Sequence, residues 1–173
     1  MKSVLLAALG CALIAATAQV AHAEIKVGDR APELDAAKTE AGKEWKLKNV
    51  KGWKLLTFGA KWCVPCAKEL PAWDKLAPTY KGKVTFVAVN VNNDRKDGKK
   101  FHDKLKLKNL LRIYMPQEQA TADEQYDTGT FPSTFVVDPQ GVIRHIHVGY
   151  ESGDEGKLKE ALTKLVGDPA AAE

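Results

Sequence analysis

Residues 58–66 read Phe-Gly-Ala-Lys-Trp-Cys-Val-Pro-Cys, and this stretch decides the fold class. The short apolar run before it, residues 54–58, predicts a buried strand that ends at Gly59. After it, apolar residues recur at spacings of three and four: Ala67, Leu70, Trp73, Leu76 and Ala77. This spacing predicts a helix that begins at the cysteines and runs to about Leu76. The two cysteines therefore lie at a junction between a strand and a helix.

A cysteine at the start of a helix is predicted to be reactive. The unpaired backbone N–H groups and the helix dipole stabilise an anion there. They lower a thiol pKa from about 8.5 into the range of roughly 3.5 to 7.5. Cys63 is therefore the predicted nucleophile, and Cys66, one turn further on, the thiol that attacks the resulting mixed disulfide. The alternative interpretation is a pair of buried structural cysteines.

The first 23 residues predict a secretory signal peptide. Lys2 gives a positive start, residues 4–20 carry no charge, and Ala21-His22-Ala23 offers the small residues that a signal peptidase reads. Cleavage after Ala23 leaves residues 24–173 as one domain in an oxidising exported compartment, the periplasm. Three alternatives stay open: an uncleaved membrane anchor, a lipoprotein modified at Cys11, and a buried core helix.

Cysteine count and net charge narrow the class of function. Without residues 1–23, Cys11 is lost and both remaining cysteines belong to one C-x-x-C. A disulfide-stapled scaffold needs several bridges, a structural zinc site needs four ligands, and covalent haem attachment needs a His where this chain has Ala67. The net charge of +4, or +3 without Lys2, is too small to predict nucleic-acid binding. We expect no metal and no cofactor beyond a redox-active Cys63–Cys66 disulfide.

The rest of the chain alternates predicted strands and helices. Residues 84–91 are nearly all apolar and rich in β-branched side chains, as a central parallel strand would be. Residues 96–107 predict a helix, residues 134–137 and 142–148 a hairpin, and residues 156–166 a closing helix. Helices between the first strands and an antiparallel pair at the end predict an α/β fold with a mixed sheet.

Residues 58–66, together with Pro71, resemble the thioredoxin superfamily. Within it, Cys-Ala-Lys-Glu-Leu-Pro at 66–71 and Gly-Asp-Arg-Ala-Pro at 28–32 resemble the TlpA, ResA and CcmG branch. Proteins of that branch are periplasmic or membrane-tethered and are concerned with cytochrome c maturation and copper delivery to oxidases. The resemblance covers nearly all of residues 25–166. It implies a thioredoxin-like fold, a mixed central β-sheet flanked by helices, with extra N-terminal strands.

The resemblance also implies which residues surround the cysteines. Phe131-Pro132 matches a loop whose cis-proline faces the disulfide, and the backbone of Phe131 would pair with an extended substrate peptide. Trp62 is the third residue expected to bind substrate. Glu69 matches an acid that assists the proton transfers of the cysteines; the alternative is an ordinary solvated helix carboxylate. Thr57 stands where thioredoxin has a buried Asp, which leaves Glu69 as the nearby acid.

Three further patterns have more than one interpretation. Residues 95–112 contain eight basic and two acidic side chains, which favours either a docking face for an acidic partner or membrane surface, or a solvated helix face. His145 and His147 share one face of a strand and are either exposed or, with the cysteines, copper ligands. Tyr126 matches a tyrosine that precedes the cis-proline loop in the family, but residues 108–130 otherwise diverge from its pattern.

Three functions remain open from the sequence. The first is a reductant of specific disulfides, as in apocytochrome c or a copper-binding protein, kept reduced by a membrane thiol electron donor. The second is a general oxidant that introduces disulfides into proteins. The third is a metallochaperone that binds Cu(I) through the two thiolates. The resemblance favours the first, for a monomer whose partners are proteins with thiols or disulfides.

Overall fold

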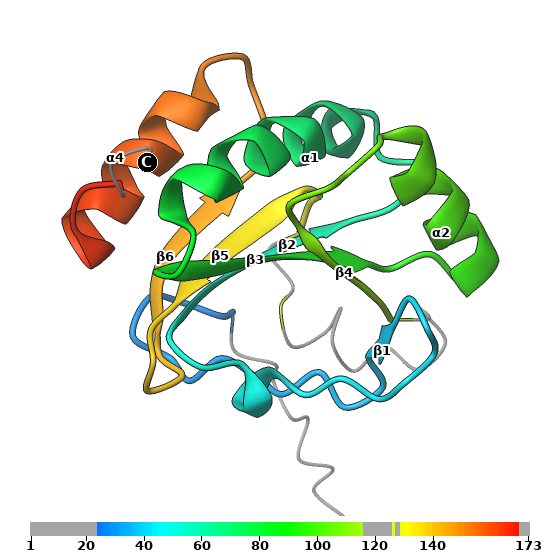
Figure 1. The fold of residues 1–173 in the computed structure, drawn as a ribbon, viewed down its shortest axis with the longest axis horizontal. Helices are drawn as coiled ribbons and strands as arrows, with labels where there is room; N and C mark the ends of the chain where they lie inside the picture. The colour runs from blue at the N-terminus through cyan, green and yellow to red at the C-terminus, as the bar shows by residue number, and fades with distance from the viewer. Residues whose placement is uncertain (1–23, 116–125, 127–128, 170–173) are drawn as a thin grey trace, which may run out of the picture.

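A computed structural model of the chain describes residues 24–115, 126 and 129–169. The predicted signal peptide, residues 1–23, lies outside them. Within this part of the chain the strands form one sheet in the order β1-β4-β3-β2-β5-β6 (Figure 1). The strands are β1 (Lys38–Thr39), β2 (Trp53–Gly59), β3 (Val84–Asn90), β4 (Leu111–Tyr114), β5 (Ser133–Val137) and β6 (Ile143–Val148).

The sheet is mixed, as the sequence predicted. β2, β3 and β4 run parallel to one another, whereas β5 and β6 form an antiparallel hairpin beside β2. β1 pairs antiparallel with β4 at the opposite edge. The helices are α1 (Val64–Leu76), α2 (Arg95–Lys104) and α4 (Asp154–Val166), with short 3-10 helices at Leu47–Asn49 and Ala77–Tyr80.

The two faces of the sheet are covered differently because side chains alternate along the central strand. On β2, Leu55 belongs to the cluster formed with the helices, through residues such as Trp73 of α1 and Leu158 of α4. Leu56 and Phe58 point the other way, into a cluster with the N-terminal segment. In Figure 1, α1 and α4 accordingly lie above the sheet and the blue N-terminal segment lies below it.

The predicted elements form, with shifted ends. The predicted helix over 96–107 begins at Arg95 and ends at Lys104, because Lys106 adopts a left-handed φ of 55° that stops helical hydrogen bonding. The hairpin turn is fixed by Asp138, whose Oδ1 accepts the backbone N–H groups of residues 140 and 142, both at 2.9 Å. The expected extra N-terminal strands amount to the two-residue β1 and isolated bridges such as Arg30 with Val142.

One strand was missed by the sequence prediction. β4 lies in the segment that diverges from the family pattern, and its four residues include the exposed Leu111, so no clear alternation marks it. Within the described ranges, no helix is both long and apolar enough to cross a membrane.

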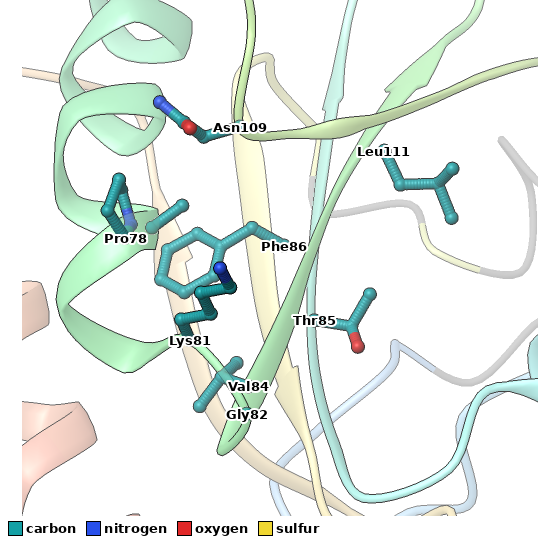
Figure 2. Close-up of a pocket in the computed structure, with 9 residues that line it drawn as sticks. Pro78, Lys81, Gly82, Val84, Thr85, Phe86, Asn109 and Leu111 are labelled. Atoms are coloured by element: carbon teal, nitrogen blue, oxygen red, sulfur yellow. The ribbon is translucent and has the colours of Figure 1, made fainter. Parts of the chain in front are cut away.

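A hollow of about 380 Å³ lies between the end of α1 and the start of β3, lined by residues such as Pro78, Lys81 and Phe86 (Figure 2). It borders Val84, which pairs with Trp53 at the start of β2. The cysteines follow the other end of β2, about 20 Å away along the strand. This hollow is therefore not part of the cysteine site.

Candidate active site

The cysteine pair lies where the sequence predicted it. β2 ends at Gly59, and α1 begins at Val64 with Cys63 as its N-cap residue. Cys63 and Cys66 form a disulfide, with 5.3 Å between their Cα atoms. The Sγ of Cys63 accepts the backbone N–H of Cys66 at 3.2 Å, so the helix start provides a donor for negative charge on this sulfur. Cys63 is 5% exposed and Cys66 is fully buried.

Gly59 is a site residue that sequence reasoning did not single out. A Cβ at this position would lie 2.9 Å from the Sγ of Cys66 and 3.0 Å from its Cβ. Real Cβ atoms do not approach other atoms so closely, so a side chain here would displace the buried sulfur. The glycine that ends β2 is therefore needed for close packing of the second cysteine, and its place directly before the C-x-x-C loop was the available signal.

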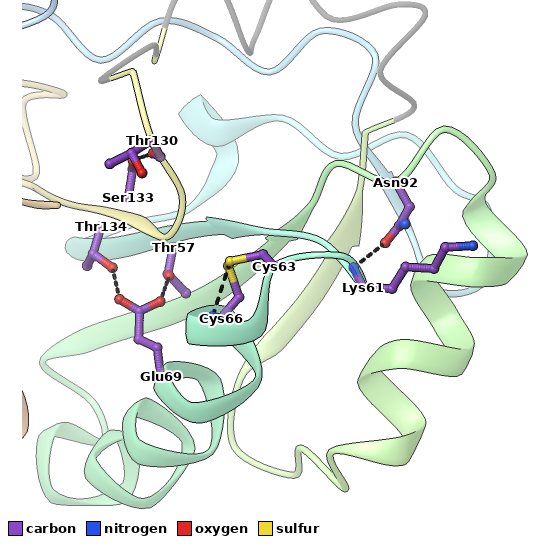
Figure 3. The surroundings of a disulfide bond; sticks show 9 residues. All are labelled: Thr57, Lys61, Cys63, Cys66, Glu69, Asn92, Thr130, Ser133 and Thr134. Atoms are coloured by element: carbon purple, nitrogen blue, oxygen red, sulfur yellow. Dashed lines mark hydrogen bonds between the residues drawn. A yellow bond between two sulfur atoms is a disulfide. The ribbon is translucent and has the colours of Figure 1, made fainter. Parts of the chain in front are cut away.

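Glu69 is buried beneath the pair. Its side chain is 0% exposed, so the alternative of a solvated surface carboxylate is wrong. Thr57 of β2 donates a hydrogen bond to its Oε2 at 2.6 Å, and Thr134 of β5 donates to its Oε1 at 3.0 Å (Figure 3). Burial raises the pKa of the Glu69 carboxyl to about 7, although the hydrogen bonds from the threonines lower it.

Glu69 and Cys66 are neighbours on α1, and they also contact neighbouring inward-facing positions of β2. They are three residues apart on α1, a spacing that puts their Cβ atoms about 5 to 6 Å apart. They also face successive inward positions of β2, since Glu69 contacts Thr57 while Cys66 packs over Gly59. At the position of thioredoxin's buried Asp, this chain thus has Thr57, whose hydroxyl binds the carboxyl group of Glu69 from α1.

The loop before β5 carries the predicted cis-proline. The peptide bond between Phe131 and Pro132 is cis. The ring of Phe131 packs edge-on against Trp62, with 5.5 Å between centroids, and Phe131 also packs against the cluster that contains both cysteines. Trp62 is 53% exposed and Val64 is 70% exposed. An apolar rim therefore surrounds the pair, and Val64 is a member that sequence reasoning did not select.

Comparison with known proteins identifies the family. Residues 27–146 match the model of the AhpC/TSA family. The chain belongs to the AhpC/TSA family. Thioredoxin-like protein YneN of Bacillus subtilis is 38% identical over 139 residues, which are 78% of this chain and 79% of that protein. Thiol-disulfide oxidoreductase ResA of Geobacillus thermodenitrificans is 32% identical over 163 residues, or 93% and 90% of the two chains.

A solved structure agrees with the fold. The crystal structure of a Chlorobium tepidum protein, described as a thiol:disulfide interchange protein DsbE, superimposes with a TM-score of 0.75. It is 25% identical, and the match covers 83% of this chain and 100% of that one. With its Cys63–Cys66 disulfide at the start of a helix, this AhpC/TSA family member is a thiol–disulfide oxidoreductase of thioredoxin-like fold.

In this AhpC/TSA family member the loop before the cysteines is held from β3 and α2. The backbone N–H of Lys61 donates to Oδ1 of Asn92 at 3.0 Å, and the N–H of Asn92 donates to Oδ1 of Asn90 at 3.0 Å. The ammonium group of Lys61 also pairs with Asp97 of α2. The two contacts of Lys61 were not anticipated from the sequence, because they join residues 31 and 36 positions apart.

The structure shows the neighbours of three further residues from the sequence analysis: Tyr126, His145 and His147. Tyr126 is buried, and its hydroxyl donates to the carbonyl of Pro32 at 2.6 Å, so it ties its segment to the N-terminal one. His147 lies 3.1 Å from Oδ2 of Asp154, whereas His145 lines a groove against α4. In the described part of this AhpC/TSA chain, no three His, Cys, Asp or Glu side chains form a group able to hold a metal.

The basic segment over residues 95–112 is partly neutralised. Arg112 forms ion pairs with Asp103, at 2.7 Å, and with Glu40. Lys99 lies 3.9 Å from the same Glu40. These pairs neutralise Arg112, and they favour neither the docking face nor the solvated helix face for the remaining lysines.

Proposed function

We propose that this protein is exported and reduces specific disulfides in client proteins, in the manner of cytochrome c maturation or copper-protein assembly. The observation that carries the proposal is the complete burial of the Glu69 carboxyl, three residues after Cys66 on α1. A reductant needs a disulfide that is more stable than those of its clients. Negative charge beside the pair disfavours the thiolates of the reduced form, and so favours the disulfide.

The reduced pair would transfer two electrons to a client in two displacements. The Cys63 thiolate attacks one sulfur of the client disulfide, a mixed disulfide forms, and the other client sulfur leaves as a thiolate that takes a proton from water. Cys66 then gives its thiol proton to the Glu69 carboxylate and attacks Sγ of Cys63. The Cys63–Cys66 disulfide closes, and the second client thiolate leaves.

Glu69 suits this proton transfer because of its pKa. With a value of about 7, the carboxyl group is present in both protonation states near neutral pH. General acid–base catalysis is most efficient when the pKa of the group lies near the working pH. A membrane thiol electron donor would recharge the pair by the reverse sequence, in which Glu69 returns its proton to Cys66.

Clients would bind across the apolar rim. Trp62, Val64 and Phe131 offer exposed or partly exposed apolar side chains beside Cys63. The cis-proline loop offers backbone groups next to the disulfide, and the carbonyl of Pro132 itself is bound by the N–H of Gly149 at 2.8 Å. An extended client segment with an apolar side chain near its cysteine fits this surface.

Export rests on the sequence of residues 1–23, which have the charge pattern and the small residues of a signal peptide. A redox pair that works as a reductant in an oxidising compartment requires a dedicated electron donor, which is why the proposal includes a membrane partner. We further propose that the protein acts as a monomer.

A general protein oxidant is the second candidate, and one contact favours it. The N–H of Cys66 donates to Sγ of Cys63, and a donor at this sulfur stabilises the thiolate and with it the reduced form. Two neighbouring groups therefore act on the pair in opposite directions. We expect Glu69 to outweigh the helix start, because it is buried where screening by water is weakest.

A redox titration decides between the two candidates. Residues 24–173 are equilibrated against dithiothreitol and glutathione buffers, and the fraction of disulfide is read after acid quenching and thiol alkylation. We expect a potential near that of thioredoxin, about −270 mV. A potential near that of the oxidant DsbA, about −120 mV, would overturn the reductant assignment and leave the cysteine chemistry in place.

A further inference from the structure

A chain of hydrogen bonds holds Glu69, and the donor at one end of the chain fixes which group donates in the next bond. The chain runs through four fully buried side chains: Trp73, Thr134, Glu69 and Thr57. The indole N–H of Trp73 donates to Oγ1 of Thr134 at 3.3 Å, and this hydroxyl donates to Glu69 at 3.0 Å. An indole N–H only donates. Trp73 therefore occupies a lone pair of Thr134, and the single hydroxyl proton of Thr134 is left for the carboxylate.

Thr57 contacts the other carboxylate oxygen under a weaker constraint. The Thr57 hydroxyl lies 2.6 Å from Oε2 of Glu69. Among the described residues, the Glu69 carboxyl is the side-chain group to which this hydroxyl is hydrogen-bonded. A hydroxyl is both donor and acceptor. It donates to the ionised carboxylate and, after rotation about its C–O bond, accepts from the protonated acid. The two threonines are thus not equivalent, because only Thr134 is fixed as a donor by a third group.

The charged groups around the chain come from β6, α4 and the loop between them. Asp154 of α4 raises the pKa of Glu69 by charge repulsion. The Asp154 carboxylate forms an ion pair with Lys157 at 2.7 Å and lies 3.1 Å from Nε2 of His147. Tyr150 packs its ring edge-on against Trp73 at 5.8 Å, and its hydroxyl donates to Glu155 at 2.5 Å.

We propose that Trp73 and Thr134 are positioning residues that hold Glu69 toward Cys66 as a proton acceptor, with Thr57 as the hydroxyl that reverses when the proton arrives. This inference rests on the proposed function of Glu69 and deepens it. Without donors, a carboxyl buried this completely would retain its proton at neutral pH and could not act as a base. The hydrogen bonds from the two threonines, and a smaller contribution from the Trp73 indole, oppose that effect of burial.

The proton affinity of Glu69 provides the test, because a purely structural role would not change it. The carboxyl carbon of Glu69 is followed by ¹³C NMR over pH 4 to 10 in the oxidised protein. We expect Thr134→Val to raise the Glu69 pKa by about 1 to 2 units, the equivalent of one hydrogen bond to a charged group. Thr134→Ser keeps the hydroxyl and should restore the original value. Thr57→Val should also raise the Glu69 pKa, because Thr57 donates across the shorter contact of 2.6 Å. Part of that rise is offset, since the variant also removes an acceptor for the protonated acid.

Trp73→Phe tests the direction of the chain. It should raise the Glu69 pKa in the wild-type background and have a smaller effect in a Thr134→Val background, where only the direct effect of the indole on Glu69 remains. The rate of disulfide exchange should shift to higher pH by the same amount as the Glu69 pKa. If Thr134→Val does not fold, Trp73→Phe alone carries the test, and an unchanged pKa in that variant overturns the proposal.

The remaining outcomes separate this inference from the proposed function. An unchanged Glu69 pKa in folded Thr134→Val, with disulfide exchange intact, overturns the directed chain and leaves the oxidoreductase as it is. An equal rise in Thr134→Ser also overturns it, since the hydroxyl is then irrelevant. A potential near that of an oxidant in the wild-type protein would overturn the reductant assignment, while the expected pKa shift in Thr134→Val would still support the chain.

Discussion

Replacing Glu69 by Gln removes a buried negative charge beside Cys66 while keeping the shape of the side chain. The amide of Gln still offers an oxygen to one threonine hydroxyl and an N–H to the other, so the contacts to Thr57 and Thr134 can be kept. Any change in the thiols of this variant therefore reports the charge. With the repulsion removed, we expect both thiols to ionise at lower pH, Cys66 more strongly than Cys63.

The size of the effect follows from the spacing of the two groups. Side chains three residues apart on a helix place a carboxylate and a sulfur about 6 Å from each other. At an effective dielectric constant of about 20, two unit charges at that separation repel by about 3 kcal/mol, or roughly 2 pKa units. The Glu69 pKa is about 7, so the carboxyl is fully charged only above that pH and the two titrations are coupled.

Thiol alkylation measures this directly. The reduced protein reacts with iodoacetamide over pH 5 to 10, and the rate constants for Cys63 and Cys66 are read separately by mass spectrometry. Glu160→Gln is a matched control, because it removes a carboxylate that is exposed on α4 and paired with Lys164. Thiol titrations of Glu69→Gln that coincide with those of the wild type would refute the reasoning. A shift equal to that of Glu160→Gln would do the same.

Three more predictions follow from the same geometry. Cys66→Ser should accumulate mixed disulfides with clients, seen on non-reducing gels, whereas Cys63→Ser should accumulate none, and equal trapping would contradict the assignment of the nucleophile. Gly59→Ala should destabilise the oxidised protein by about 1 to 3 kcal/mol in urea unfolding, because its Cβ would meet Sγ of Cys66 at 2.9 Å, and wild-type stability would show that the strand shifts freely. Stability should fall as pH rises from 4.5 through 7, since a raised carboxyl pKa favours folding only below that range. The loss approaches about 3 kcal/mol, and Glu69→Gln should remove it if the buried acid is the cause.

Local patterns were sufficient to predict most of the fold and the reactive pair. The spacing of apolar residues predicted α1 to its last residue, Leu76, because one face of that helix is buried along its length. The cysteines were predicted because their chemistry depends on the helix start, which is a local feature. The hairpin was predicted for a similar reason, as Asp138 and the flanking β-branched residues act over a few positions.

The environment of Glu69 could not be predicted in this way. Its spacing from Cys66 was visible in the sequence, but its burial depends on Thr57 and Thr134, which are 12 and 65 residues away. No sequence pattern indicated that two strands would offer hydroxyls to one carboxyl. β4 was missed because it has only four residues and begins with an exposed leucine, so no clear alternation marks it.

The unequal burial of the two sulfurs has a consequence for survival under oxidative stress. Peroxide must first reach a sulfur to oxidise it, and Cys63 is the slightly accessible one while Cys66 is sealed. A sulfenic acid formed on Cys63 lies one turn from the thiol of Cys66, which can condense with it to form the ordinary disulfide and release water. Oxidation at Cys63 is thereby returned to the normal working cycle before irreversible sulfinic acid forms.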